Sequence, residues 1–349
     1  MTTHIAWDKR ADAAHKTLEK RFWNADLSVY SPSYPWANDR IEDPFHYWWQ
    51  AHALDVLVDG LERTGDPFYE NRINELLHGV IISNEGSITN NYYDDMLWMA
   101  LALLRAHNLT KSNAYLGYSR VLWNDIKTGW NDHCGGGIAW RKQQLDYKNT
   151  PSNGPAVILA ARLYQLEGQE EDLDWAKRIF HWLTKHLVDP ETGFVWDGMN
   201  REQDGKIDKD WEYTYCQGVY MGAAHELFKC TGDSTFLAKA SRTADTAIVH
   251  LANDDLVLLA EGDSDGDCGL FKGIFVRYLA NLVMENGNPL WQEFFLANGH
   301  SLWERARSPE GFFANSWEGP VKTPVSLSVQ LSGTMLLESL ARMQQSGNL

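Results

Sequence analysis

The sequence lacks several features that define common functional classes. Its four cysteines, Cys134, Cys216, Cys230 and Cys268, lie far apart without a C-x-x-C pair, which leaves no local zinc or redox motif. None of the 12 histidines has the H-E-x-x-H or a similar local spacing, so we expect no metal and no cofactor. The longest apolar run, from Met96 to Leu104, is too short to span a bilayer.

Positive charge is also scarce. The 31 Lys and Arg residues face 47 Asp and Glu residues, which gives a formal net charge of −16. Such a surface repels phosphate backbones and anionic lipids, so we expect no nucleic acid and no membrane as partner. The segment from Met1 to Asp12 has no apolar signal core. We therefore expect a cytoplasmic monomer, or a secreted protein if a signal has been removed.

Aromatic residues are abundant instead. The chain has 16 Trp, 14 Tyr and 13 Phe. Flat aromatic faces stack well on the C–H faces of sugars, which favours a neutral carbohydrate as substrate. A large helical core that uses many aromatic residues is the alternative explanation.

Helical periodicity dominates the chain. Apolar or small residues recur at Trp49, Ala53, Val56 and Leu57, which lie on one helical face. Turn signals such as Gly65-Asp66-Pro67 end one helix and start the next. The pattern predicts twelve helices, near residues 3–24, 44–64, 67–83, 92–107, 111–126, 152–167, 170–187, 212–231, 234–252, 268–286, 289–305 and 325–344.

Two kinds of helix alternate along the chain. One kind is apolar or small nearly all round, as in residues 152–167, and such helices are buried on most sides. The other kind is amphipathic, as in residues 170–187. Six of each kind predict an all-α fold, an (α/α)₆ barrel, in one domain over residues 1–349. A helical solenoid is the alternative, but it would expose one face of each buried helix.

Long connections precede the buried helices, whereas the other connections are only a few residues long. Connections of more than about 12–15 residues are usually functional in compact domains. In a closed barrel they would all lie at the N-terminal ends of the inner helices, so we expect a cleft there. The long connections are residues 25–43, 84–91, 127–151, 188–211, 253–267 and 306–324.

Two adjacent carboxylates open one of these buried helices. Asp94 and Asp95 follow Tyr92-Tyr93 and precede the apolar Met96-Leu97-Trp98. Glycoside hydrolysis needs two carboxyl groups, and a retaining pair is about 5–5.5 Å apart, which adjacent positions allow. The alternative is structural, because two aspartates at a helix start often cap it and match its dipole.

These residues carry a resemblance to glycoside hydrolase family 76, the α-1,6-mannanases. The segment Tyr92-Tyr93-Asp94-Asp95-Met96-Leu97-Trp98 resembles the catalytic segment of the family. Further matching segments lie at 134–140, 148–155, 214–218 and 271–279, so the resemblance spans most of the chain.

The resemblance implies an (α/α)₆ barrel and a retaining endo-α-1,6-mannanase that acts on mannan or manno-oligosaccharides. It also implies that Asp94 is the nucleophile and Asp95 the general acid/base. The physics agrees with these roles, because a helix N-terminus favours an ionised Asp94, and its charge makes Asp95 hold a proton more tightly. One position departs from the family, which more often has Asn where this chain has Cys216.

Other polar and aromatic residues near the predicted cleft are candidates for substrate binding. Gly135-Gly136-Gly137 either admits a ligand close to the backbone or forms a tight turn. Asn153 either binds sugar or caps a helix, and Arg277 is expected to be a structural ion-pair partner in a buried helix. The candidate substrate-binding residues are Asn91, Tyr93, Trp36, Trp140, Asn149, Tyr215, Gln217, Lys272 and Trp317.

Two other functions remain open at this stage. One is a different reaction on the same barrel, either transglycosylation or hydrolysis of another sugar, as in unsaturated glucuronyl hydrolases. The other is a carbohydrate-binding protein without catalysis. The intact Asp94-Asp95 pair argues against the second, because binding alone does not require it.

Overall fold

The computed structural model describes residues 6–35, 45–262 and 266–349. Over these ranges the chain forms twelve α-helices, and each predicted helix boundary lies within four residues of the observed one. The helices are α1 (Trp7–Arg21), α2 (Tyr47–Thr64), α3 (Pro67–Ser83), α4 (Tyr93–Thr110), α5 (Asn113–Ile126), α6 (Thr150–Glu167), α7 (Glu170–Leu187), α8 (Thr214–Thr231), α9 (Ser234–Leu251), α10 (Cys268–Asn286), α11 (Pro289–Glu304) and α12 (Leu327–Gln345).

Four of the helices that precede short connections end in the same way, with a glycine in the left-handed conformation. Gly65, Gly168, Gly232 and Gly287 follow α2, α6, α8 and α10 with φ between 63° and 70°, the left-handed conformation that glycine adopts without strain. In each case the backbone N–H of the glycine binds a carbonyl of the last helical turn. Lys111 has the same conformation after α4, where the sequence offers no glycine.

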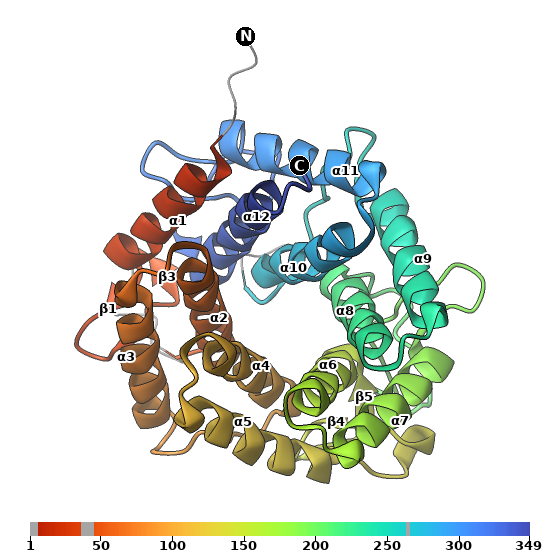
Figure 1. The fold of residues 1–349 in the computed structure, drawn as a ribbon. Coiled ribbons are helices and arrows are strands. Elements are labelled where there is room, and N and C mark those ends of the chain that lie inside the picture. The colour runs from red at the N-terminus through yellow and green to blue at the C-terminus, as the bar shows by residue number, and fades with distance from the viewer. Residues whose placement is uncertain (1–5, 36–44, 263–265) are drawn as a thin grey trace. The chain divides into compact units, whose positions relative to one another are not determined.

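The chain divides into two compact units, residues 1–83 with 248–349 (unit 1) and residues 84–247 (unit 2). In unit 2, α6 lies between α4 and α8, while α5 packs on α4 and α7 packs on α6 and α8 (Figure 1). Helices α4, α6 and α8 are buried over most of their length, whereas α5, α7 and α9 expose one side. The sequence prediction of two alternating kinds of helix is therefore confirmed within this unit.

Unit 1 repeats the arrangement. Helix α12 lies between α2 and α10, and α1 and α11 pack on α12 while α3 packs on α2 (Figure 1). Helices α2, α10 and α12 are the buried set here. The division into two units does not test whether residues 1–349 form a single domain, which stays a prediction.

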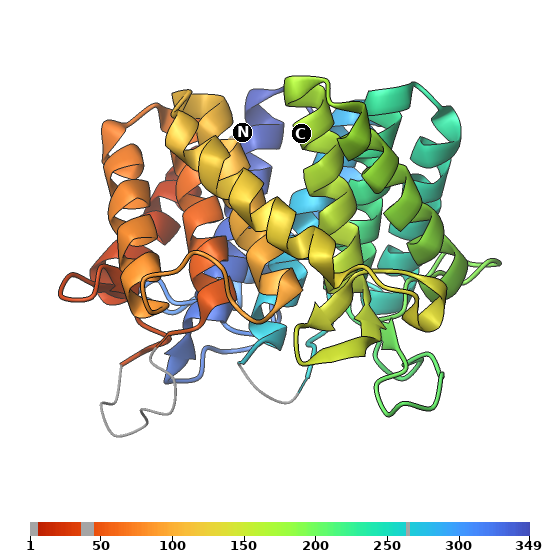
Figure 2. The same ribbon diagram turned by 90° about the horizontal axis from the view of Figure 1, so that it is seen from below.

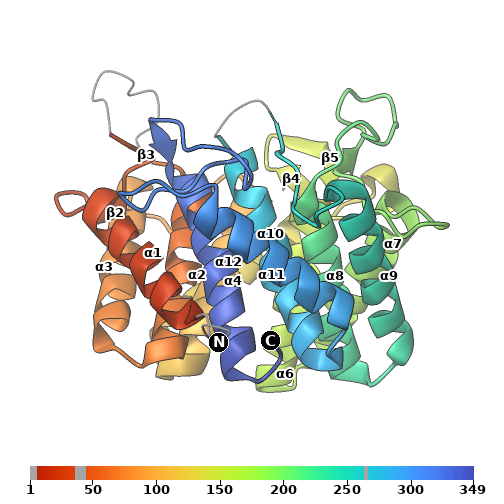
Figure 3. The ribbon, with the colours of Figure 1, turned by 90° about the horizontal axis from the view of Figure 1, so that it is seen from above.

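Short strands line the N-terminal ends of the buried helices. In unit 2, β4 (Ala139–Arg141), β5 (Gln144–Asn149) and β6 (Gly198–Met199) form an antiparallel sheet, and β5 runs directly into α6 (Figure 2). In unit 1, β3 (Ser33–Tyr34) pairs with β7 (Val325–Ser326), which runs into α12 (Figure 3). A two-stranded sheet of β1 (Trp23–Asn24) and β2 (Val29–Tyr30) follows α1. Within each unit, the long connections thus gather where buried helices begin.

Buried amide side chains hold these connections in place. Gln217 of α8 accepts a hydrogen bond from the Val195 N–H (2.9 Å) and donates one to the Val195 carbonyl (2.7 Å). Asn153 of α6 binds both backbone groups of Ile138 in the same way, at 2.8 and 2.9 Å. We call these pairings amide clamps. Each satisfies two buried backbone groups that would otherwise be costly to remove from water.

Unit 1 has two equivalent amide clamps. Gln50 of α2 binds the N–H and carbonyl of Tyr30, at 2.9 and 2.8 Å. Gln330 of α12 binds the Phe313 N–H (3.1 Å) and the Gly311 carbonyl (3.3 Å). All four clamp residues stand four positions after the N-cap residue of their helix, so the same helical turn performs the task each time.

The helices of the described part of the chain are all too short or too polar to cross a membrane.

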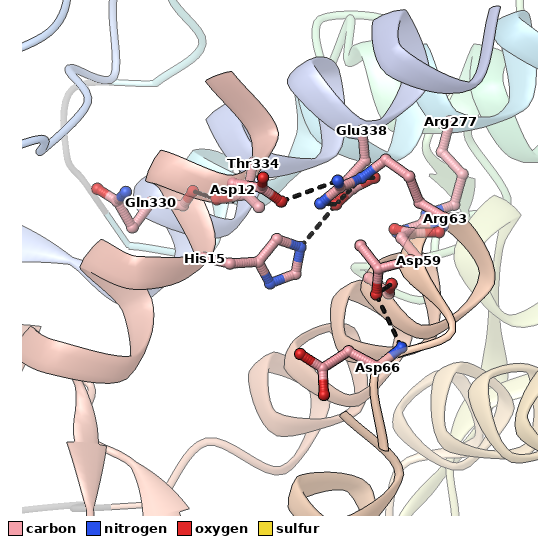
Figure 4. Close-up of polar contacts among 11 residues, drawn as sticks. Asp12, His15, Asp59, Arg63, Asp66, Arg277, Gln330, Thr334 and Glu338 are labelled. Atoms are coloured by element: carbon pink, nitrogen blue, oxygen red, sulfur yellow. Dashed lines mark hydrogen bonds and ion pairs between the residues drawn. The ribbon is translucent and has the colours of Figure 1, made fainter. Parts of the chain in front are cut away.

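At the other end of the unit 1 helices, a buried ion-pair network links α1, α2 and α12. Glu338 of α12 accepts three hydrogen bonds from Arg63 of α2, between 2.9 and 3.1 Å, and one contact from His15 of α1 at 2.7 Å. Asp12 of α1 pairs with the same guanidinium at 2.8 Å. Figure 4 shows these side chains converging from the three helices. The network ties together elements that are far apart in the sequence.

We predict that Glu338→Gln destabilises the protein by roughly 3 kcal/mol, because it leaves the Arg63 guanidinium without its buried counter-charge. The change keeps the shape of the side chain, so lost packing contributes little. The free energy of unfolding in urea measures the effect. Glu293→Gln, on the exposed side of α11, is the matched control and should change stability by less than about 0.5 kcal/mol. Equal effects of the two variants would contradict the prediction.

Candidate active site

Asp94 and Asp95 lie in the first turn of α4, after the N-cap residue Tyr92. The side chain of Asp94 is buried, with 8% of its surface exposed, whereas Asp95 is half-buried. The backbone N–H of Asp95 donates to Oδ1 of Asp94 at 3.0 Å, and Asn90 Nδ2 donates to Oδ2 of Asp95 at 3.0 Å. The two carboxyl groups therefore differ in environment although they are adjacent in sequence.

Strand β4 brings Trp140 against this pair. A backbone bridge between Tyr92 and Arg141 joins β4 to the start of α4. The indole N–H of Trp140 donates to the Asp94 carboxylate. The Trp140 ring packs edge-on against Tyr92 and Tyr147, with centroids 5.4 and 5.8 Å apart. The predicted sugar platform Trp140 is thus half-buried and fixed beside Asp94.

A third carboxylate, Asp197, lies on the connection before β6. It is buried and accepts hydrogen bonds from the hydroxyls of Tyr215 (2.6 Å) and Tyr147 (3.1 Å). Arg201 forms an ion pair with it at 2.8 Å, and the Cys216 thiol lies 3.6 Å from its Oδ1. Four side chains from α8, β5 and the neighbouring connection therefore meet at one carboxylate.

Burial governs the protonation of this cluster. The pKa of Asp94 is raised to about 7, mainly by desolvation and to a smaller extent by the charge of Asp197. Hydrogen bonds from the Asp95 backbone and from Trp140 oppose this shift because they favour the carboxylate form. Burial likewise raises the pKa of Asp197, against the hydrogen bond from Tyr215 and the charge of Arg201.

The direction of the Asp94 shift corrects the expectation from the sequence. The helix N-terminus was expected to keep Asp94 ionised, but removal of the side chain from water outweighs that effect. A buried carboxyl group with a pKa near neutrality is typical of active sites. Asp94 Oδ1 does accept from a first-turn N–H, that of Asp95, but its buried position and raised pKa favour a functional role beyond helix capping.

Several predicted substrate contacts have structural tasks instead. Gln217 is fully buried and both ends of its amide form the clamp on Val195, so its observed contacts are structural and its contact with a sugar stays a prediction. Asn149 caps α6 by accepting from the Ser152 N–H at 3.2 Å, the task expected of Asn153. Tyr93 is buried, and its hydroxyl contacts Thr128 at 3.3 Å.

The candidates in unit 1 are also buried. Lys272 donates to the backbone carbonyl of Asn315, and its ammonium lies 4.7 Å from the ring centroid of Trp317. Both side chains are only 1% exposed and contact other groups of the protein, so their contact with substrate stays a prediction. Burial lowers the pKa of Lys272 to about 8, against the charges of Glu261 and Glu318. The observed contacts of Lys272 are thus with other groups of unit 1.

The remaining candidates have different outcomes. Asn91 is exposed next to the carboxylate pair, and its carbonyl accepts from the Lys142 N–H at 2.9 Å. Trp36 lies outside the described residues. Gly136 and Gly137 have positive φ, and a Cβ at Gly137 would collide with the Trp182 ring, so these glycines serve packing and not approach of a ligand.

The structure confirms Arg277 as an ion-pair partner, of Asp55 at 3.1 Å and Asp59 at 2.6 Å. Arg277 and Asp59 border a pocket in unit 1 with a volume of about 320 Å³. It lies among paired charges at the C-terminal ends of α2 and α12, away from the N-terminal ends of these helices. The described residues contain no cluster of side chains suited to a metal ion.

Sequence reasoning missed Asp197, Tyr147 and Arg201. None of them lies on a helix, so periodicity gave no signal. One usable signal was present, because Asp197 stands between Trp196 and a glycine in a long connection that precedes a buried helix. An acid in that position is a reasonable candidate for the same cleft as Asp94.

Comparison with known proteins agrees with this geometry. Residues 6–341 match the family model described as Glycosyl hydrolase family 76. A mannan endo-1,6-alpha-mannosidase, DCW1 of Candida glabrata, is 28% identical over 269 residues, which is 70% of this chain and 60% of that protein. The chain therefore spans about 60% of the length of the curated relatives that it matches.

Two solved structures cover almost the whole chain. The Lin0763 protein from Listeria innocua is 36% identical, with a TM-score of 0.93 over 98% of each chain. An inactive variant of the α-1,6-mannanase GH76A of Salegentibacter sp. HEL1_6, in complex with α-1,6-mannotriose, is 38% identical with a TM-score of 0.90, over 97% of this chain and 99% of that one. These structures confirm the predicted fold class, all-α of the (α/α)₆ barrel type.

We predict that Asp94→Asn stabilises the protein at pH 8 by roughly 4 kcal/mol. The folded-state pKa of Asp94 is about 7, above its ordinary value of 3.8. The folded chain therefore holds more protons than the unfolded chain between these values, so wild-type stability falls as pH rises from about 4 to about 7. The asparagine variant has no carboxyl group to ionise here, so its stability does not fall in this way. Urea unfolding at pH 4.5, 6 and 8 measures the difference in the free energy of unfolding between the variant and wild type.

The matched control for this prediction is Asp174→Asn, on the exposed side of α7. It removes the same charge from the surface and should change stability by less than about 0.5 kcal/mol at each pH. A stability difference between Asp94→Asn and wild type that does not vary with pH would contradict the prediction.

Proposed function

The chain belongs to glycosyl hydrolase family 76, and on this premise we propose that it is a retaining endo-α-1,6-mannanase that cleaves α-1,6-linked mannose polymers or oligosaccharides. The observation that carries the proposal is the pair Asp94 and Asp95 in two different environments, one buried against Trp140 and one half-exposed. The likeness to a mannanase that binds α-1,6-mannotriose supports the choice of sugar and linkage.

The reaction proceeds in two displacements at the anomeric carbon. The Asp94 carboxylate attacks this carbon while the Asp95 carboxyl group donates its proton to the departing glycosidic oxygen, which leaves a glycosyl ester on Asp94. Asp95, now ionised, removes a proton from water, and the water oxygen attacks the anomeric carbon and releases Asp94. Two inversions give net retention.

The surroundings of each carboxyl group suit its role. Two N–H groups, from Trp140 and from the Asp95 backbone, hold the attacking carboxylate of Asp94 in one orientation. Asn90 orients Asp95 through one oxygen, and the half-exposed position of Asp95 lets water reach it in the second step. Asp197 and its partners brace the wall that carries Trp140, because Tyr147 contacts both.

The substrate is neutral, which suits a chain with a net charge of −16. Asp94, Asp95, Trp140 and Asp197 all belong to unit 2, which supports the proposal that the protein acts as a monomer.

We predict that the purified protein converts linear α-1,6-mannan to manno-oligosaccharides of several lengths, the pattern of endo action. Either Asp94→Asn or Asp95→Asn should lower kcat by at least about 1,000-fold, since each removes a group that acts in both chemical steps. Product chromatography and the anomeric signals in a proton NMR time course measure products and stereochemistry. Glu293→Gln is the control and should keep full activity.

Three outcomes would overturn parts of this proposal. Absence of cleavage of both mannan and short manno-oligosaccharides by wild type would refute the α-1,6-mannanase assignment. Products longer than the substrate would indicate transglycosylation. Release of the inverted anomer first would refute the two-displacement mechanism.

The dependence of kcat/KM on pH distinguishes the roles of the two carboxyl groups. Asp94 must be ionised to attack, and its pKa is about 7, so we predict that kcat/KM rises with pH through about 7. Asp197→Asn removes a negative charge that raises this pKa, so the rising limb should move to lower pH. Tyr147→Phe removes a hydrogen bond to Asp197 but keeps the charge of Asp197, so the rise of kcat/KM should occur at the same pH as in wild type.

A rate that only falls as pH rises through 7 would assign the acid role to Asp94 and contradict the proposed order. An unchanged limb in Asp197→Asn would show that this carboxylate does not act on Asp94 electrostatically.

A further inference from the structure

Trp211 is an exposed aromatic residue that core packing does not explain. It lies three residues before α8, on the connection that carries Asp197, and 40% of its surface is exposed. The Arg201 guanidinium lies 3.7 Å from its ring centroid. Since a cation in this position covers one face of the indole, the exposed surface belongs mainly to the rest of the ring.

The orientation of this indole is fixed by groups of the candidate active site. Arg201 pairs with Asp197 at 2.8 Å and with Asp208 at 3.0 Å, and its guanidinium also lies 4.5 Å from the ring centroid of Tyr147. Planar pairing with two carboxylates leaves the guanidinium little freedom. The Arg201 guanidinium therefore holds the Trp211 ring in place, while 40% of the Trp211 surface remains exposed to solvent.

A row of aromatic rings connects Trp211 to the catalytic cluster. Tyr213 lies between Trp211 and Tyr215, with centroid distances of 6.0 and 5.9 Å. The Tyr215 hydroxyl binds Asp197 at 2.6 Å, and the charge of Asp197 acts on Asp94. The exposed ring thus lies at the outer end of a continuous series of contacts that leads to the proposed nucleophile.

We propose that Trp211 forms an outer subsite, which stacks on a mannosyl residue of the polymer beyond those next to the cleaved bond. The inference rests on the proposed mannanase function and deepens it, since it assigns a residue that favours long substrates. Aromatic rings supply large, rigid contact surfaces for the C–H faces of sugars at little cost in side-chain entropy.

The charges around Trp211 fit a neutral ligand. The positive charge of Arg201 is paired with Asp197 and Asp208, so the support of the ring does not select an anion. A pyranose ring of mannose carries no charge and requires only a flat apolar face with polar groups at its edge. The half-buried Tyr213, whose ring centroid lies 6.0 Å from that of Trp211, brings a hydroxyl group into this neighbourhood.

The test compares substrate lengths and not a single rate. Wild type, Trp211→Ala and Trp211→Phe are assayed on the shortest α-1,6-manno-oligosaccharide that wild type cleaves, and on one several residues longer. For Trp211→Ala, the ratio of kcat/KM between the long and the short substrate should fall roughly 10-fold, through a higher KM for the long one. Trp211→Phe keeps a flat ring and should restore most of the ratio.

Trp303→Ala is the matched control, because this half-buried tryptophan also stacks on guanidinium groups, of Arg307 at 4.1 Å and Arg10 at 4.9 Å, at the C-terminal end of α11. It should leave the length ratio unchanged. Thermal unfolding of each variant shows that the folded state is retained.

The outcomes separate this inference from the proposed function. If wild type cleaves no α-1,6-linked substrate, the proposed function fails. If wild type is active and Trp211→Ala leaves the length ratio unchanged, or lowers kcat/KM equally for both lengths, the outer subsite is refuted while the mannanase function stands.

Discussion

The amide clamp is the interaction on which the site depends. A long connection that lies against buried helices carries backbone N–H and carbonyl groups away from water, and each such group must find a partner. Four inner helices meet this constraint in the same way, with an Asn or Gln four residues after the N-cap. One amide satisfies a donor and an acceptor together, which fixes the connection both in position and in orientation.

Two of these clamps place the groups around Asp94. Asn153 holds Ile138, two residues before Trp140, and Gln217 holds Val195, two residues before Asp197. Residues 138–140 are extended, so Ile138 and Trp140 point to the same side of the backbone and the clamp on Ile138 aims Trp140, while the clamp on Val195 anchors the connection two residues before Asp197. The clamps thereby deliver an indole N–H and a carboxylate to the same helix start. The raised pKa of Asp94 follows from this enclosure, because the walls exclude the water that would stabilise its charge.

The sequence predicted the helices, and the position of Asp94-Asp95 at the start of one of them, because their signals are local. Helical period, glycine stops and two adjacent acids at a helix start need no knowledge of distant residues. The sequence could not reveal the contacts that the structure shows for Gln217 and Lys272, because these contacts are not local. A polar residue in a buried helix contacts either a ligand or the backbone of another segment, and only tertiary structure distinguishes these cases. Asp197 was missed since irregular connections carry no period, although their ends are fixed by the clamps.

Cys216 acts on Asp94 indirectly. It contacts Asp197, and the charge of Asp197 acts on Asp94. The Cys216 thiol lies 3.6 Å from Asp197, at a position where the resemblance to the family led us to expect asparagine. A thiol is a weaker hydrogen-bond donor than an amide, so it stabilises the ionised form of Asp197 less. Tyr215, Tyr147 and Arg201 supply the strong donors. Since the charge of Asp197 raises the pKa of Asp94, a residue on α8 that touches neither catalytic aspartate still influences the pH at which Asp94 becomes ionised.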